Sequence, residues 1–183
     1  MKSRVAAGVL AVVATVGLVG CSGAAPKPSP TPTPPFASAD AAYKAAEATY
    51  RGYVDALNEV QLEHQTSFKP VFAWLLGSAL EGDKAQFRAM SAKGWKVSGD
   101  SHVTQAQPLE KDSDDPRWGD VTIAVCLDVR SVNVVDAEGV SQVASTRPAF
   151  QAINVTVHRD AGSPTGLKIS DLSTRAGAPT CGG

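Results

Sequence analysis

The chain has 183 residues and a formal net charge of −1, from 17 basic and 18 acidic side chains. This length suits one domain of ordinary size. Loss of an amino-terminal leader that carries Lys2 and Arg4 would change the net charge from −1 to −3. Because nucleic-acid binders neutralise phosphates with clustered basic residues, and none cluster here, we expect no nucleic-acid partner.

Residues 1–20 have the layout of an export signal. Lys2 and Arg4 precede an uncharged apolar stretch at 5–19. That stretch of about 15 residues is shorter than the roughly 20 that a membrane-spanning helix needs. The run Leu-Val-Gly-Cys ending at Cys21 resembles the lipobox of bacterial lipoproteins, whose cysteine is lipidated and becomes the first residue. We therefore expect Cys21 to hold the chain on the extracytoplasmic face of the cell membrane.

Residues 21–37 predict a tether between this anchor and the folded part. Six prolines remove backbone donors and fix φ, so the segment cannot form helix or sheet: Pro26, Pro28, Pro30, Pro32, Pro34 and Pro35. It should extend as polyproline II, at about 3.1 Å per residue. One domain is then expected over 38–183.

Helical periodicity dominates the first part of this domain. Residues 38–65 predict one amphipathic helix, with apolar residues at spacings of three and four: Tyr43, Ala46, Tyr50, Val54 and Leu57. A short second helix is expected near Pro70. Ser78 to Glu81 match a capping box that would open a third helix, with Leu80, Phe87 and Met90 on one face and a stop at Gly94.

Alternating, β-branched patterns follow Gly94. They predict four strands, at 95–107, 120–135, 143–159 and 166–173. Turn residues at 136–139 and 160–164 would join neighbouring strands, which makes the sheet antiparallel. In the second strand, Val121, Ile123 and Val125 alternate with Thr122 and Cys126, so one face should pack on helices and the other meet solvent. The predicted class is α+β, with three N-terminal helices packed on a curved four-stranded antiparallel sheet.

This order of elements resembles the cone-shaped nuclear transport factor 2-like (SnoaL-like) superfamily, and more closely its secreted actinobacterial-type lipoproteins. The matching pieces span roughly residues 40 to 181: MSAKGWKVSGDSHV at 90–103, VCLD at 125–128, Arg147-Pro148 and Cys181. The resemblance implies the cone fold. It implies no activity, because most members of that lipoprotein group have none assigned.

Cys126 and Cys181 remain once Cys21 is lipidated. An exported protein meets an oxidising milieu, so we expect a disulfide between them. The alternative, two free thiols in a catalytic or metal-binding role, lacks a CxxC spacing and a histidine nearby in sequence.

No motif predicts a metal or a cofactor. The only histidines, His64, His102 and His158, have no zinc-ligand spacing. The acidic run at 112–115 lacks the glycine and glutamate of a calcium loop. Phosphate-loop, dinucleotide and Ser-His-Asp patterns are missing as well. Asp128 is expected to pair with Arg130 or to meet solvent.

A pocket is the least defined prediction. Enzymes of the cone fold place Asp, Tyr or His inside the cone, whereas the inward positions inferred here are aliphatic. Residues that could line a cavity, or simply form core, are Tyr43, Tyr50, Tyr53 and Trp95.

Our leading hypothesis is a non-catalytic binding or scaffold domain for an envelope protein or an apolar small molecule. A cone-fold isomerase, dehydratase or hydrolase is the alternative, and an envelope protein carried by a mobile element is a third hypothesis. Superfamily members often pair through the sheet, but the polar residues along these strands leave monomer and homodimer open.

Overall fold

The computed structural model describes residues 31–109 and 115–182, and the chain from Thr33 onward groups into one compact unit. The leader, Cys21 and most of the tether lie outside the described residues, as do residues 112–114 of the acidic run.

Helix α1, Ala39–Asn58, carries the predicted apolar stripe. Ser38 caps it, since its Oγ accepts a hydrogen bond from the Ala41 N–H at 3.1 Å. The helix ends before the predicted residue 65. Asn58 instead turns its amide onto the Ser101 backbone, donating to the Ser101 carbonyl at 3.0 Å and accepting from its N–H at 2.9 Å. This clamp ties the end of α1 to the start of the sheet.

Two short elements follow, a 3-10 turn η1, Gln65–Phe68, and α2, Lys69–Phe72, and then a longer helix α3, Gly77–Ala92. The predicted capping box at Ser78 is wrong. Helix α3 begins one residue earlier, and the Ser78 hydroxyl donates to the Ser170 carbonyl of β6 at 2.9 Å. The Ser78 hydroxyl thus makes a tertiary hydrogen bond to the sheet and does not cap the helix.

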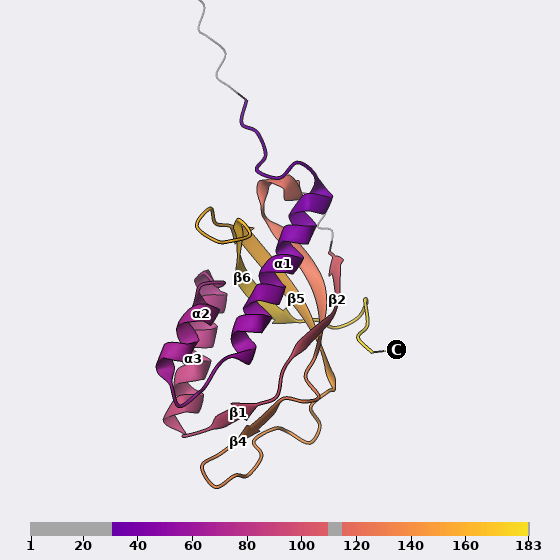
Figure 1. Ribbon diagram of the computed structural model, residues 1–183. Coiled ribbons are helices and arrows are strands. Elements are labelled where there is room, and N and C mark those ends of the chain that lie inside the picture. Colours follow the sequence, from indigo (N-terminus) through magenta and orange to yellow (C-terminus); the bar gives the residue numbers. More distant parts are fainter. Residues whose placement is uncertain (1–30, 110–114, 183) are drawn as a thin grey trace, which may run out of the picture. The chain divides into compact units, whose positions relative to one another are not determined.

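The main sheet has four antiparallel strands in the order β2-β3-β5-β6. Their bounds are β2 His102–Pro108, β3 Val121–Asp128, β5 Phe150–Arg159 and β6 Leu167–Thr174. Figure 1 shows α1 lying across this sheet, with α2 and α3 beside it. The α+β class, with three helices and a four-stranded antiparallel sheet, is confirmed.

Two further strands form a separate antiparallel ribbon: β1, Lys96–Ser98, and β4, Asn133–Val135. The first two predicted strands are therefore each split in two. At Gly99 (φ +77°) the chain passes so close to a second turn that an added Cβ would lie 1.9 Å from the Ser131 carbonyl oxygen. The predicted turn at 136–139 closes the tip of this ribbon and does not join β3 to β5.

Strand β5 begins at Phe150, seven residues later than predicted. The preceding stretch is irregular because Arg147 reaches back to the turn after β3. Its guanidinium donates to the carbonyls of Val129 at 2.8 Å and Val132 at 2.7 Å. Residues 143–149, predicted to be part of a strand, therefore form a loop that is held in place by Arg147.

The inner face of the sheet forms the core. Val121, Ile123 and Val125 of β3 lie opposite Val157, Val155 and Ile153 of β5, and the helices cover them. The outer face of β3 was expected to meet solvent, and this is wrong: Thr122, Ala124 and Cys126 are buried too. Longer side chains on neighbouring strands flank these short ones, and the carboxy-terminal tail reaches Cys126.

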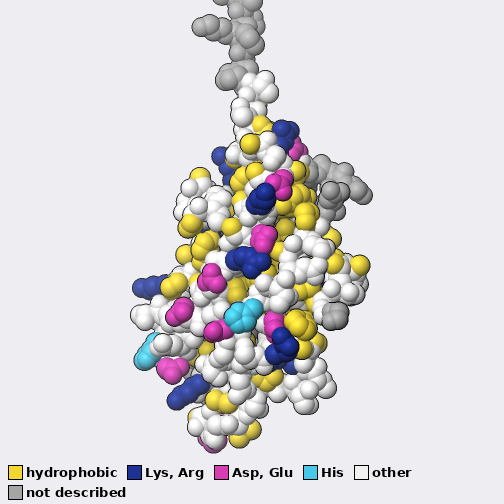
Figure 2. Space-filling model, turned by 45° about the vertical axis from the view of Figure 1, so that its right-hand side comes forward, with side chains coloured by type: hydrophobic (Ala, Val, Ile, Leu, Met, Phe, Trp, Pro, Cys, Tyr) yellow, Lys and Arg dark blue, Asp and Glu magenta, His cyan; other side chains and the backbone are white. Residues whose placement is uncertain are grey.

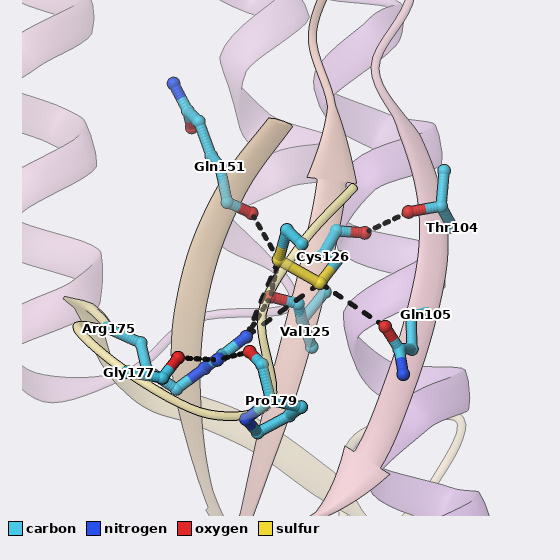
Figure 3. Close-up of a disulfide and its surroundings, with 9 residues drawn as sticks. Thr104, Gln105, Val125, Cys126, Gln151, Arg175, Gly177 and Pro179 are labelled. Carbon is cyan, nitrogen blue, oxygen red and sulfur yellow. Dashed lines mark hydrogen bonds between the residues drawn. A yellow bond between two sulfur atoms is a disulfide. The ribbon is translucent and has the colours of Figure 1, made fainter. Parts of the chain in front are cut away.

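The predicted disulfide between Cys126 and Cys181 is present, with an S–S distance of 2.01 Å and Cα atoms 5.4 Å apart. Figure 3 shows the Arg175 side chain directed at it. Arg175 is 7% exposed, and its guanidinium donates to the Val125 carbonyl at 3.3 Å, to the Gly177 carbonyl at 3.2 Å and to the Pro179 carbonyl.

No ion pair among the described residues involves Arg175, so its buried charge rests on carbonyl dipoles and on sulfur. Its Nη2 lies 3.6 Å from the Cys181 sulfur and 3.9 Å from the Cys126 sulfur. The arginine and the disulfide together hold the tail on the outer face of the sheet.

Replacing both Cys126 and Cys181 by alanine should lower the free energy of unfolding by about 4 kcal/mol, because the disulfide closes a long loop in the unfolded chain. Urea denaturation followed by circular dichroism measures the change. Wild-type protein in excess dithiothreitol should show the same midpoint as the double variant. Equal midpoints for oxidised wild type and double variant would contradict the stabilising role.

Candidate functional site

A groove of about 780 Å³ runs between α3 and the ends of β5 and β6. We call it the α3 groove. Ile153 and Leu172 come from the inner face of the sheet, and Ser78, Ala79 and Gly82 line the helix side. These three residues are small, and a Cβ built on Gly82 would meet nothing within 4 Å. The small helix residues therefore leave the groove open.

A tyrosine–aspartate pair lies in this groove. Tyr53 of α1 is 6% exposed and donates its hydroxyl to Asp83 Oδ2 of α3 at 2.9 Å. Burial raises the pKa of Asp83 above its usual value, and the hydrogen bond from Tyr53 only partly offsets this rise. Burial also holds the pKa of Tyr53 well above its usual value. Tyr53 thus remains a protonated donor at neutral pH.

Asp83 has no cationic partner: none of the ion pairs among the described residues includes it. A half-buried carboxylate without a counter-charge favours a ligand that donates a hydrogen bond or carries positive charge. With its pKa raised, the same group is also a better proton acceptor than a surface aspartate. The pair can therefore orient a polar group or exchange a proton with it.

The aromatic residues expected at a pocket do not share one. Tyr53 lines the α3 groove, whereas Tyr50 is 2% exposed in the core, with its ring centroid 5.7 Å from that of Tyr53. Tyr43 borders a shallow hollow of about 170 Å³ beside β2. Trp95 is half-buried, with the Lys93 ammonium 4.6 Å from its ring centroid. Of the four, Tyr53 alone contributes to the α3 groove.

Sequence reasoning missed Asp83, although a signal for it existed. Leu80, Phe87 and Met90 were assigned to one apolar face of the third helix. The spacing of three and four that links them passes through position 83. A charged residue on an apolar stripe indicates either a buried partner or a site, and Tyr53 is that partner.

The remaining polar candidates lie apart from the groove. Arg130 donates hydrogen bonds from its guanidinium and its backbone N–H to the Asp128 carboxylate, which lowers the pKa of Asp128 to about 2, and Nη2 lies 2.6 Å from Oδ2. His158 pairs with Asp120 at the surface, and His102 is exposed. Figure 2 shows acidic and basic side chains interspersed over the face that it presents.

Within residues 31–109 and 115–182, no three His, Cys, Asp or Glu side chains gather as metal ligands. None of the described helices is long and apolar enough to cross a membrane.

Changing Tyr53 to Phe should raise the pKa of Asp83 further, because the carboxylate loses its hydrogen-bond donor. NMR titration of the Asp83 carboxyl carbon measures this shift. A pKa higher in the folded than in the unfolded chain means that stability is lost as pH rises through the folded value, so the variant should lose more than wild type. Tyr50→Phe, which keeps the hydrogen bond, is the control, and an unchanged Asp83 titration in Tyr53→Phe would refute the coupling.

Comparisons with known proteins do not identify a family or a function for this chain. No family model matches the sequence, and no curated protein matches it. Three solved structures align with most of the chain at low identity. A periplasmic fragment of TraM is 13% identical, covering 73% of this chain and 97% of its own, with a TM-score of 0.39.

The periplasmic domain of DotI is 15% identical over 74% of this chain and 93% of its own, with a TM-score of 0.41. A candidate polyketide cyclase from Xanthomonas campestris pv. campestris is 11% identical over 70% and 90%, with a TM-score of 0.32. TM-scores this low carry no argument about what the chain does, so the α3 groove must be interpreted from its own residues.

Proposed function

We propose that this chain is a lipid-anchored extracytoplasmic lipoprotein whose domain binds a small, largely apolar molecule in the α3 groove. The observation that carries the proposal is the Tyr53–Asp83 pair, a protonated donor beside a carboxylate without a counter-charge, placed against apolar side chains. The lining mixes apolar side chains such as Ile153 and Leu172 with polar ones that include Asp171 and Arg175. A site with apolar surface and convergent polar groups suits an amphiphilic small molecule. The cone fold implied by the resemblance would hold its ligand between helices and sheet, where this groove runs.

The disulfide supports an extracytoplasmic location for the domain. A disulfide persists in oxidising spaces outside the cytosol, and Cys126 is joined to Cys181. The export signal and the lipobox-like run at Cys21 agree with that address. The proline-rich tether would hold the domain off the bilayer, within reach of molecules in the envelope.

Charge defines the ligand class more closely. Two carboxylates, Asp83 and Asp171, line the groove, whereas the guanidinium of Arg175, which also lines it, donates to backbone carbonyls. The two carboxylates would disfavour a carboxylate or phosphate and favour a hydroxyl, an amide N–H or an amine. Ile153 and Leu172 would cover the apolar remainder. We therefore expect an uncharged or cationic amphiphile.

A second candidate is an isomerase or dehydratase acting in the same groove. The raised pKa of Asp83 favours it, because a general base works best when its pKa lies near the working pH. Turnover separates the two functions: a binding protein releases its ligand unchanged. An enzyme would convert it and lose that conversion in Asp83→Asn.

Changing Cys21 to Ser should abolish lipidation, because serine has no thiol to take the diacylglycerol. The wild-type chain is expected to sediment with membranes and to begin at a modified Cys21. The variant is expected to keep its leader. Detergent phase partitioning and mass spectrometry of the amino terminus measure both. A native chain that retains residues 1–20, or whose amino-terminal Cys21 carries no acyl chain, would refute the anchor.

Changing Gly82 to Phe should fill the α3 groove without strain on the helix, since a Cβ there has open space. Binding of the uncharged amine N-phenylnaphthylamine, followed by its fluorescence, is expected to weaken at least about tenfold, a loss of about 1.4 kcal/mol. Ala85→Phe, an exposed position on the same helix, is the matched control. Equal binding by Gly82→Phe, or equal loss in both variants, would contradict a site in the groove.

A further inference from the structure

We infer that the domain has a second ligand site, separate from the α3 groove, for an uncharged apolar molecule of about one ring. The site is a pocket of about 210 Å³ where the ends of α1 and α3 meet the β1–β4 ribbon. Figure 1 shows the ribbon set apart from the main sheet, beyond the ends of these helices. We call it the ribbon pocket, and its apolar lining is Leu57, Val60, Leu62, Phe87, Met90, Val97, Val132 and Val134.

The pocket is partly open to solvent, and its volume is larger than the voids that close packing leaves inside a domain. Protein interiors hold few voids larger than a water molecule. An apolar cavity of about 150 Å³ is enough to bind benzene. The ribbon pocket therefore has room for one ring and a small substituent, and too little for a long acyl chain.

The walls are held in place by contacts that do not depend on a ligand. Leu62 and Phe87 are 1% and 4% exposed and belong to the core. On the opposite side, the Asn58 amide holds the Ser101 backbone by two hydrogen bonds. The Ser131 hydroxyl donates to the Asp100 carbonyl at 2.6 Å, which fastens the two turns of the ribbon together. A pocket between fixed walls keeps its shape when empty.

The β1–β4 ribbon supplies the remaining wall of the pocket and does not extend the main sheet. Strands β1 and β4 pair with each other and add no strand to the main sheet. Val97 and Val134, a register pair, both line the pocket while remaining half-buried. The ribbon therefore covers an apolar hollow that it does not fill.

Polar groups at the rim define what kind of molecule fits. Within the described residues, the side chains of Gln86 and Ser98 make no hydrogen bond, so each can pair with a ligand hydroxyl or carbonyl. Asp100 is the single charged residue among those that line the pocket. A carboxylate-bearing ligand would meet that charge without a compensating base, which favours an uncharged molecule such as a phenol.

The inference does not rest on the proposed function. The two hollows share one lining residue, Gln86, and lie against different parts of α3. A variant that closes one hollow can therefore leave the other open.

Fluorine NMR with para-fluorophenol as the probe tests the site on the full Cys21→Ser chain. We expect saturable binding and perturbed methyl signals of Val97, Val132 and Val134. Para-fluorobenzoate, of similar size but anionic, should bind at least about tenfold more weakly, because Asp100 repels it. Val134→Phe should weaken para-fluorophenol binding by a similar factor by filling the pocket.

Val140→Phe is the matched control, since Val140 lies in the turn after β4, is 59% exposed and does not line the pocket. Val140→Phe should bind para-fluorophenol as wild type does. Gly82→Phe, which closes the α3 groove and removes any binding there, is the second control and should leave the methyl perturbations of Val97, Val132 and Val134 unchanged. The proposal is overturned by non-saturable binding, by equal affinity for the two probes, or by methyl perturbations confined to other residues. Should Val134→Phe fail to fold, the methyl map and the comparison of the two probes still decide the matter.

Discussion

The packing of α1 on the inner face of the sheet is the contact on which the rest of the domain depends. Ala42 and Ala46 are completely buried there and have almost no side chain, so the helix can approach β-branched residues such as Val125 and Val155 closely. Burial of this apolar surface supplies most of the driving force for folding. The chain between α2 and α3 is joined to the sheet by its own contact, because the Leu76 N–H donates to the Ile169 carbonyl of β6 at 2.8 Å.

The outer face of the sheet is organised by covalent and charged groups. A buried guanidinium is costly unless its donors are satisfied, and Arg175 satisfies most of them with carbonyls from the tail and from β3. The disulfide brings those tail carbonyls within reach. This part of the fold thus depends on an oxidising compartment, in which a disulfide persists. The export signal predicted for residues 1–20 would deliver the chain to such a compartment.

Helix α3 separates two hollows of different chemistry. Towards β5 and β6, small residues leave space around Asp83, whose carboxylate is held by Tyr53 and lacks a counter-charge. Towards the ribbon, Phe87 and Met90 border a smaller pocket with an apolar lining and a polar rim that includes Gln86 and Asp100. One helix can serve both because its residues repeat every three or four positions and so present different faces. Both hollows belong to the proposals made above for small-molecule binding.

The sequence by itself determined the α+β class, with three helices and a four-stranded antiparallel sheet, and the cysteine pair, because these depend on local periodicity and on the chemistry of a few residues. The lipidation of Cys21 stays a prediction that rests on residues 1–21. Tertiary structure alone decided where the long strands break, since the turn at Gly99 forms against Ser131, far along the chain. It also placed Asp83 beside Tyr53, 30 positions away, and assembled the ribbon pocket from segments that no short pattern connects. Such contacts arise when segments far apart in the sequence pack together. The residues next to each contacting residue in the sequence therefore give little sign of the contact.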